Sequence, residues 1–224
     1  MKAFLPSLLL LFSACTTAQT GTELLKEVKT QLENGSVTVS TILADNKYAS
    51  LHPETSFRQL IEKYSATGVL KIAAANEPGR KIKVFCTIND QDGKPVPGVS
   101  VYLYQTDYRG WYAADAPHVG GNEGDMRHAR LFGYVKTDNK GQFELHTVKP
   151  SGYPSSDLPA HIHIHFFAAG YNSSVTEFLF DDDERLVGNI REQAVRNRFL
   201  IAQPGKASAP FEQSFNYSIT LQKL

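Results

Sequence analysis

The sequence has no excess of charge of either sign. Its 224 residues contain 23 Lys and Arg against 23 Asp and Glu, so the formal net charge is zero. A chain without net charge carries no broad electrostatic field, which argues against nucleic acid or an anionic lipid surface as the main partner. Internal repeats, low-complexity runs and a second long apolar run are also missing, which excludes a solenoid and a multi-span membrane protein. The expected partner is a small molecule.

The one long apolar run of the sequence lies in its first residues. MKAFLPSLLLLFSAC begins with a basic Lys2, continues with the run from Phe4 to Phe12, and reaches Cys15 through small residues. This pattern is typical of a secretion signal and is too short to span a bilayer. The ending FSAC resembles the lipobox of bacterial lipoproteins. We expect residues 1–14 to be a signal peptide and Cys15 to be lipidated, which makes the protein an extracytoplasmic lipoprotein, periplasmic or at the cell surface. The alternative is secretion without a lipid.

Residues 15–79 are predicted to form a helical lead-in or linker. GTELLKEVKTQLENG and HPETSFRQLIEKYSATG both place apolar residues at helical spacing, and a Gly follows each pattern. The piece SVTVSTIL between them is predicted to be extended. This lead-in is the candidate for a subunit contact in a homo-oligomer.

Residues 80–224 are predicted to form an antiparallel β-sandwich, so the fold class is mainly β. Short strands separated by turns run from KIKVFCTI to the closing FEQSFNYSITLQ, with one late helix in DERLVGNIREQAVRN. With Cys15 used as an anchor, Cys86 has no disulfide partner, and its apolar strand predicts a buried thiol. The long connection DYRGWYAADAPHVGGNEGDMRHAR interrupts the strands, and such loops in compact sandwiches are more often functional than idle.

Three histidines alternate along one predicted strand. In AHIHIHF, His161, His163 and His165 share a face, because side chains two residues apart in a strand point the same way. The outer two lie roughly 13 Å apart, too far to bind one metal ion together. The residues alone leave two neighbouring pairs open, and they also allow an ordinary solvent-exposed face. Zinc and copper sites use the same spacing, so the histidines do not choose the metal.

Two tyrosines close to these histidines favour ferric iron. Tyr153 lies in a Gly-Tyr-Pro turn shortly before the histidine strand, and Tyr112 ends the YRGWY stretch of the long connection. A phenol with a pKa of about 10 stays protonated unless a strong Lewis acid binds it, and phenolate oxygen suits a hard, highly charged ion. Two phenolates and a hydroxide would neutralise Fe(III), and two neutral imidazoles would complete its ligands.

Three segments, taken together, resemble the intradiol ring-cleavage dioxygenases, the catechol and protocatechuate dioxygenase superfamily. They are DGKPVPGVSVYLYQTDYRGWY, GYVKTDNKGQFELHTVKPSGYP and LPAHIHIHF, in this order, and the resemblance covers about residues 80 to 185. It implies an antiparallel β-sandwich that holds a non-haem Fe(III). The implied ligands are Tyr112, Tyr153, His161 and His163, which leaves His165 without an assigned role.

The resemblance also implies a reaction. A catechol would lose both protons and chelate the iron, with hydroxide and Tyr153, released from the metal, acting as bases. Dioxygen would then be inserted between the two hydroxylated carbons to give a muconic acid, without nicotinamide or flavin.

Two positions depart from the family pattern. The arginine that usually precedes the Pro-Ala-His-x-His piece is Leu158 here, and a glutamine of the following strand aligns with Glu177. Both changes remove electrostatic help near the bound substrate. Together with Trp111 and Arg109 these residues are expected to line the substrate pocket. The candidate replacement cations lie in the long connection: Arg109, Arg127 and Arg130.

Three interpretations stay open on the sequence. The first is an active dioxygenase with a rearranged pocket, in which a cation such as Arg130 acts in catalysis. The second is an extracytoplasmic protein that binds iron and a catechol without cleaving the ring. The third is a zinc or copper site on the same strand. Which catechol or other phenol is the substrate does not follow from the residues.

Overall fold

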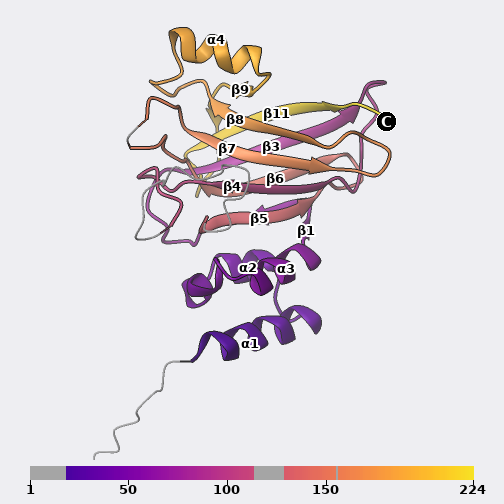
Figure 1. Cartoon of the computed structure of the whole chain (residues 1–224), viewed down its shortest axis with the longest axis vertical. Coiled ribbons are helices and arrows are strands. Elements are labelled where there is room, and N and C mark those ends of the chain that lie inside the picture. Colours follow the sequence, from indigo (N-terminus) through magenta and orange to yellow (C-terminus); the bar gives the residue numbers. More distant parts are fainter. Residues whose placement is uncertain (1–18, 114–128, 155) are drawn as a thin grey trace, which may run out of the picture.

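The computed structural model describes residues 19–113, 129–154 and 156–224. Among the described residues, three α-helices and a short 3-10 helix lie at one end of the molecule, a two-layered sandwich occupies the middle, and the helix α4 lies at the other end (Figure 1). The elements are α1 Gly21–Glu33, α2 Val39–Leu43, the 3-10 helix η1 Asn46–Leu51, α3 Thr55–Lys63, β1 Ala66–Thr67, β2 Val69–Lys71, β3 Lys81–Asp90, β4 Ser100–Gln105, β5 Leu131–Lys136, β6 Gln142–Val148, β7 His161–Phe167, β8 Ser174–Phe180, α4 Gly188–Arg196, β9 Leu200–Ala202, β10 Gly205–Lys206 and β11 Gln213–Leu221.

The helical lead-in contains one element that was predicted differently. Residues 39–43 form the short helix α2, where an extended piece was expected. The side chain of Thr38 accepts a hydrogen bond from the backbone N–H of Thr41, which caps the first turn of the helix. Tertiary packing then stabilises it, because Val39, Ile42 and Leu43 are all buried. Burial outweighs the β preference of the branched residues here.

The lead-in packs directly on the sandwich. Helix α3 lies against β5, and the guanidinium of Arg58 lies 3.5 Å from the ring centroid of Phe132. The same guanidinium donates a hydrogen bond of 2.9 Å to the hydroxyl of Tyr102 on β4. Strands β1 and β2, which fall within the predicted lead-in, pair with β5 and β6. The two parts of the chain therefore share both sheets.

The strands of the described residues form two sheets, so the predicted sandwich is confirmed. One sheet has six strands in the order β1-β5-β4-β7-β8-β9, and the other has five in the order β10-β11-β3-β6-β2. The sheets are mixed rather than purely antiparallel, because β3 and β11 are parallel neighbours, as are β8 and β9. A parallel pair needs a crossover connection, and for β8 and β9 the late helix α4 lies in that connection.

The hydrophobic core lies between the two sheets. Phe178 of β8 stacks on Tyr217 of β11 with ring centroids 4.0 Å apart, and Phe180 meets Phe215 edge to face at 4.8 Å. Cys86 of β3 is 1% exposed, as predicted for a buried thiol, and burial raises its pKa. These contacts hold β8 against the second sheet and so fix the strand that lies beside the histidines.

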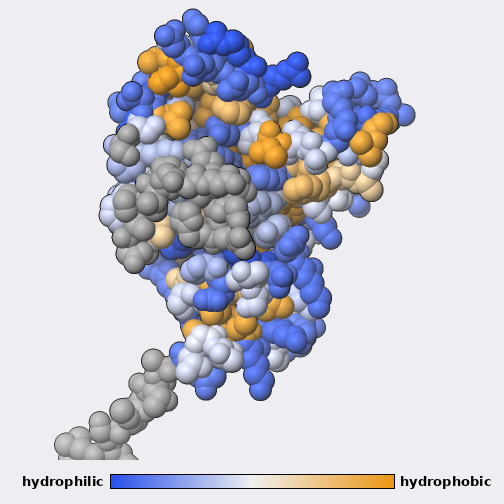
Figure 2. Space-filling model, viewed as in Figure 1, coloured by the Kyte–Doolittle hydropathy of each residue, from blue (hydrophilic) through white to orange (hydrophobic). Residues whose placement is uncertain are grey.

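The face of the molecule seen in Figure 2 is mostly hydrophilic, with apolar residues in several places, one of them where helix α4 meets the strands. A small apolar cluster joins these elements and is made of Leu179, Leu186 and Ala194. Among the described residues, no helix is both long enough and apolar enough to cross a membrane.

Candidate metal centre

Strand β7 carries its three histidines on the outer face of the six-stranded sheet. The alternate residues Ile162, Ile164 and Phe166 are 0% exposed and belong to the core. An ordinary solvent face would leave the histidines exposed, yet His161 and His163 are each 5% exposed. The loops that carry Tyr112 and Tyr153 reach these two imidazoles and cover them. The first two histidines of the strand therefore belong to a buried polar site.

Four side-chain atoms converge at this site. The hydroxyl oxygens of Tyr112 and Tyr153 lie 2.7 Å apart. Tyr112 Oη lies 3.0 Å from His163 Nε2, and Tyr153 Oη lies 3.1 Å from His161 Nε2. The two Nε2 atoms are themselves 3.1 Å apart. All four residues are at most 5% exposed.

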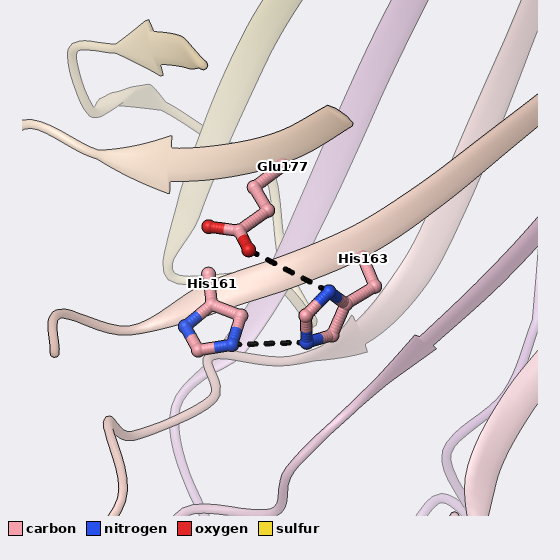
Figure 3. A group of neighbouring side chains, drawn as sticks. All are labelled: His161, His163 and Glu177. Carbon is pink, nitrogen blue, oxygen red and sulfur yellow. Dashed lines mark hydrogen bonds and ion pairs between the residues drawn. The ribbon is translucent and has the colours of Figure 1, made fainter. Parts of the chain in front are cut away.

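The other ring nitrogens fix which way the histidine lone pairs point. His161 Nδ1 lies 2.8 Å from the carbonyl oxygen of Pro159, which only accepts, so Nδ1 carries the proton and Nε2 presents a lone pair. His163 Nδ1 faces Glu177 Oε1 at 3.7 Å (Figure 3), because the two residues are direct cross-strand partners on β7 and β8. Each imidazole thus has an outer partner behind it and turns Nε2 towards the tyrosines.

This donor set fits a hard, highly charged cation. Two imidazole lone pairs facing each other at 3.1 Å repel unless a proton or a metal ion lies between the groups. The phenolic protons can serve that purpose, and a metal ion that replaces them converts both hydroxyls into anionic oxygen ligands. Glu177 also has a ligand atom within 4.8 Å of those of the two histidines, and its Oε1 lies 3.7 Å from Nδ1 of His163, the ring nitrogen that does not face Tyr112. Glu177 is an outer neighbour of the site.

Two glycines explain how the tyrosine loops come so close together. Gly110 has φ +83, and a Cβ on it would lie 2.3 Å from the backbone oxygen of Gly152. A Cβ on Gly152 would lie 2.1 Å from the backbone oxygen of Leu158. A side chain at Gly110 would push the two loops apart, and a side chain at Gly152 would distort the loop that carries Tyr153. The Gly in RGWY and the Gly in GYP therefore place Tyr112 beside Tyr153.

Asp107 organises the loop that carries Tyr112. Its side chain is 2% exposed and accepts hydrogen bonds from the backbone N–H groups of Arg109, at 2.8 Å, and Trp111, at 3.1 Å. Its own N–H donates to the carbonyl of Trp111 at 2.8 Å. These bonds close a tight turn, so the loop leaves β4 and brings Tyr112 back over the sheet.

Two further residues hold the loop of Tyr153, and the sequence reasoning missed both. Arg185 Nη1 donates to the backbone oxygens of Tyr153 at 3.1 Å, Ser156 at 3.2 Å and Leu158 at 3.3 Å. Asp183 accepts from the backbone N–H of Ala160 at 3.0 Å, directly before the histidine strand. In the sequence they belong to the charged run DDDER, which carries no signal of partners 23 to 32 residues earlier.

The predicted replacement cations are paired with acids. The guanidinium of Arg109 lies 2.7 Å from Asp107 and 4.1 Å from the centroid of the Trp111 ring. Arg130 donates to both carboxylate oxygens of Glu77, at 2.6 and 2.7 Å. Arg127 lies outside the described residues, as do the predicted signal peptide and Cys15. The catalytic role of Arg130 stays a prediction.

A cavity of about 220 Å³ adjoins the centre on the side of helix α4. It includes His161 together with Leu158 and Glu177, two of the four residues expected to line a substrate pocket, while Trp111 and Arg109 lie elsewhere. Its lining residues are Leu158, Pro159, His161, Glu177, Leu179, Ile190, Gln193, Ala194, Asn197 and Phe199. A larger cavity of about 1210 Å³ opens between α2 and β6, and none of the site residues lines it.

The chain matches a family model described as Dioxygenase over residues 60–223. It is 27% identical over 129 residues to catechol 1,2-dioxygenase of Acinetobacter baylyi, covering 50% of this chain and 40% of that protein. It is 26% identical over 129 residues to chlorocatechol 1,2-dioxygenase of Rhodococcus opacus, covering 50% of this chain and 48% of that protein. The chain thus spans less than half the length of these two relatives.

Solved structures share the fold. The 3-chlorocatechol 1,2-dioxygenase of Rhodococcus opacus superposes with a TM-score of 0.54 at 22% identity, over 71% of this chain and 64% of that one. A mercury-inhibited catechol 1,2-dioxygenase of Acinetobacter superposes with a TM-score of 0.57 at 17% identity, over 90% of this chain and 84% of that one. The second superposition covers 90% of this chain and so reaches beyond the sandwich into the helical lead-in.

Proposed function

The chain belongs to the dioxygenase family of the intradiol ring-cleavage type, and from that membership we propose that it binds a non-haem Fe(III) and cleaves a catechol with dioxygen. Cleavage would occur between the two hydroxylated carbons and give a muconate-type product. One observation carries the proposal: the buried convergence of Tyr112, Tyr153, His161 and His163 on four mutually close donor atoms.

The four convergent residues would hold the iron. Ferric iron, when bound, would supply a Lewis acid that holds a chelated catechol and polarises its ring for the reaction with dioxygen. The histidines contribute neutral Nε2 atoms, which Pro159 and Glu177 hold in that orientation from behind. Two phenolates balance most of the charge of a ferric ion, which explains why the site combines two tyrosines with two neutral ligands.

Tyr153 would also act as a base. Tyr153 lies in a loop that is held by hydrogen bonds from Arg185 and by the close contact of Gly152 with the backbone of Leu158. Its Oη adjoins His161, which lines the cavity where a ring can enter. When Tyr153 gives up its place to the substrate, the free phenolate can take the proton of a substrate hydroxyl at Oη. The family resemblance assigns this movement to Tyr153, so Tyr112 would keep its place.

The cavity would accommodate one aromatic ring. Leu158, Leu179, Ile190 and Phe199 supply apolar contacts and exclude water from the ring. With a volume of about 220 Å³ the cavity is smaller than the usual range for drug-sized ligands, which favours a substrate with a single ring and a short substituent.

Where the protein works remains a proposal supported by the sequence alone. The apolar run before Cys15 supports export and lipidation, which would place the catechol substrate outside the cytoplasm. The partners are then a small catechol, dioxygen and the membrane through the lipid anchor. A homo-oligomer formed through the helical lead-in is the further expectation.

Oxygen uptake with catechol tests the proposed activity. The iron-loaded protein should consume dioxygen and produce the ultraviolet absorbance of a muconate. The Tyr112→Phe variant should lose this activity, because an anionic ligand is removed. Tyr171→Phe is the matched control, since Tyr171 lies in the connection between β7 and β8 and is not one of the convergent residues. An iron-loaded protein that binds catechol and consumes no oxygen would contradict the proposal.

A further inference from the structure

We propose that the ion pair between Glu77 of the lead-in and Arg130 holds Tyr112 in place, so that Glu77 is a positioning residue of the metal centre. The proposal rests on the proposed function in one respect, because it takes Tyr112 as a ligand of the iron. It adds that the segment before the sandwich supports this ligand. Arg130 would then act on Tyr112 rather than on the substrate.

The backbone of Arg130 is bonded directly to the backbone of Tyr112. The N–H of Arg130 donates a hydrogen bond of 2.7 Å to the carbonyl oxygen of Tyr112. The carbonyl oxygen of Arg130 accepts a hydrogen bond of 2.7 Å from Nδ1 of His52 in the lead-in. The carbonyl oxygen of Ala129 accepts another, of 3.3 Å, from the guanidinium of Arg58. This short stretch of main chain therefore connects the lead-in to Tyr112.

The side chain of Arg130 makes a second connection between the same parts. Its two terminal nitrogens donate to the two carboxylate oxygens of Glu77 at 2.7 and 2.6 Å, a bidentate geometry that fixes the plane of the guanidinium. Nη2 of Arg130 also lies 4.0 Å from Oδ2 of Asp107. Asp107 closes the turn that leads to Tyr112. The guanidinium therefore contacts both Glu77 and this turn.

A close backbone contact brings the segment of Glu77 to the same turn. Gly79 has φ +113, and a Cβ on it would lie 2.9 Å from the Cβ of Tyr108. Tyr108 follows Asp107 directly in the turn that leads to Tyr112. The missing side chain at Gly79 therefore lets the segment pack against the turn.

Burial makes this ion pair hard to replace. The side chain of Glu77 is 5% exposed and that of Arg130 is 21% exposed. Water compensates poorly for a partner lost in such a setting, so removing one charge destabilises the position of the other. Arg130 carries the ion pair on its side chain and the bond to Tyr112 on its main chain. A displaced guanidinium would therefore disturb Tyr112 as well.

Amide hydrogen exchange of the full-length chain tests the proposal without relying on iron. The N–H of residue 130 donates to Tyr112, so its exchange rate, corrected for the intrinsic rate, reports how often that bond opens. In Glu77→Gln, and in Arg130→Lys, which loses the bidentate geometry, this amide should exchange about tenfold faster, as for one lost hydrogen bond. The control Glu27→Gln, which breaks the contact with Lys47 elsewhere in the lead-in, should leave the rate unchanged.

The iron-loaded protein provides a second readout at the metal centre. Glu77→Gln and Arg130→Lys should both shift the tyrosinate-to-iron absorption band of the substrate-free protein. They should also release iron to a chelator about tenfold faster, the usual effect of removing a residue that orients a metal ligand. The double variant should be no worse than either single variant, because the two residues act as one unit. Glu27→Gln should keep the band and the release rate of the parent protein.

The outcomes separate the inference from the proposed function. If residue 130 exchanges in Glu77→Gln as in the parent, or faster only in step with every other protected amide, the inference is wrong while the proposed function stands. If Arg130→Lys weakens catechol binding but leaves exchange and band unchanged, Arg130 acts on the substrate and the inference is again wrong. A protein that retains no iron refutes the proposed function, and the exchange rates still decide whether Glu77 holds Tyr112 in place.

Discussion

Replacing Gly110 by alanine is expected to separate the two tyrosines that converge in the metal centre. The new Cβ would lie 2.3 Å from the backbone oxygen of Gly152, roughly 1 Å inside ordinary contact. A backbone oxygen cannot rotate away as the end of a flexible side chain can, so one of the two loops must move. A shift of about 1 Å at reacting groups can lower activity about a hundredfold.

Backbone strain and a steric clash should both lower the free energy of unfolding of Gly110→Ala. Alanine at φ +83 costs about 1 to 2 kcal/mol, and the clash adds about 1 to 3 kcal/mol. Gly98→Ala isolates the first component, because Gly98 has φ +71 and nothing within 4 Å of an added Cβ. Gly152→Ala isolates the second, because its Cβ would meet the backbone oxygen of Leu158 at 2.1 Å without a left-handed backbone.

Urea unfolding and iron retention against a chelator read the two effects separately. Gly110→Ala and Gly152→Ala should both lose iron faster than the parent protein, and Gly98→Ala should retain it. Gly110→Ala should also be less stable than Gly98→Ala. If Gly110→Ala retains iron like the parent and matches Gly98→Ala in stability, the close approach of the loops does not position the tyrosines, and the explanation of the RGWY and GYP motifs is refuted.

Three other perturbations have defined outcomes. Burial lowers the pKa of His52 to about 4, so between pH 6.5 and 4 the unfolded chain binds a proton at His52 that the folded chain does not. The free energy of unfolding should therefore keep its full value above pH 6.5 and fall by about 3 kcal/mol as the pH drops to 4. Urea unfolding of His52→Gln should show a smaller fall over the same range. Arg185→Met should lower the free energy of unfolding by about 1 to 3 kcal/mol and release iron faster, because it removes the hydrogen-bond donors that hold the Tyr153 loop. The control Arg196→Met, on the exposed side of α4, should change neither. Cys15→Ser should move the protein from the membrane fraction to the soluble fraction, and an unchanged distribution would argue against lipidation.

Local patterns in the sequence were sufficient for the sandwich. Burial alternates along β3 as the apolar period of the sequence predicts, so that strand could be predicted. In β7 the period predicted the shared face of the histidines but not their burial, because the first four residues of that strand are all buried. Helix α2 was not predicted, because its stability comes from the burial of Val39 and Ile42 against distant elements. The parallel pairing of β3 with β11 joins strands more than a hundred residues apart, which periodicity does not reveal.

For the metal centre, too, part of the arrangement could be predicted from the sequence and part could not. Strand geometry reduced three histidines to a neighbouring pair, and the structure brings His161 and His163 together, with His165 beside Tyr102 instead. The choice of Tyr112 and Tyr153 among ten tyrosines came from the family resemblance, since no spacing rule links residues 41 positions apart. Arg185 and the contact of Gly110 with Gly152 depend on backbone atoms that any residue could supply. Contacts of this kind cannot be predicted from the residue types in the sequence.

Metal analysis with a visible spectrum of the purified protein tests the central claim most directly. We expect iron as the bound metal and a purple to red colour from tyrosinate-to-iron charge transfer. The band should change in Tyr153→Phe and stay unchanged in Tyr171→Phe, because only Tyr153 is one of the four convergent residues. A colourless protein that contains zinc, or a coloured one whose band is the same in Tyr153→Phe, would contradict it.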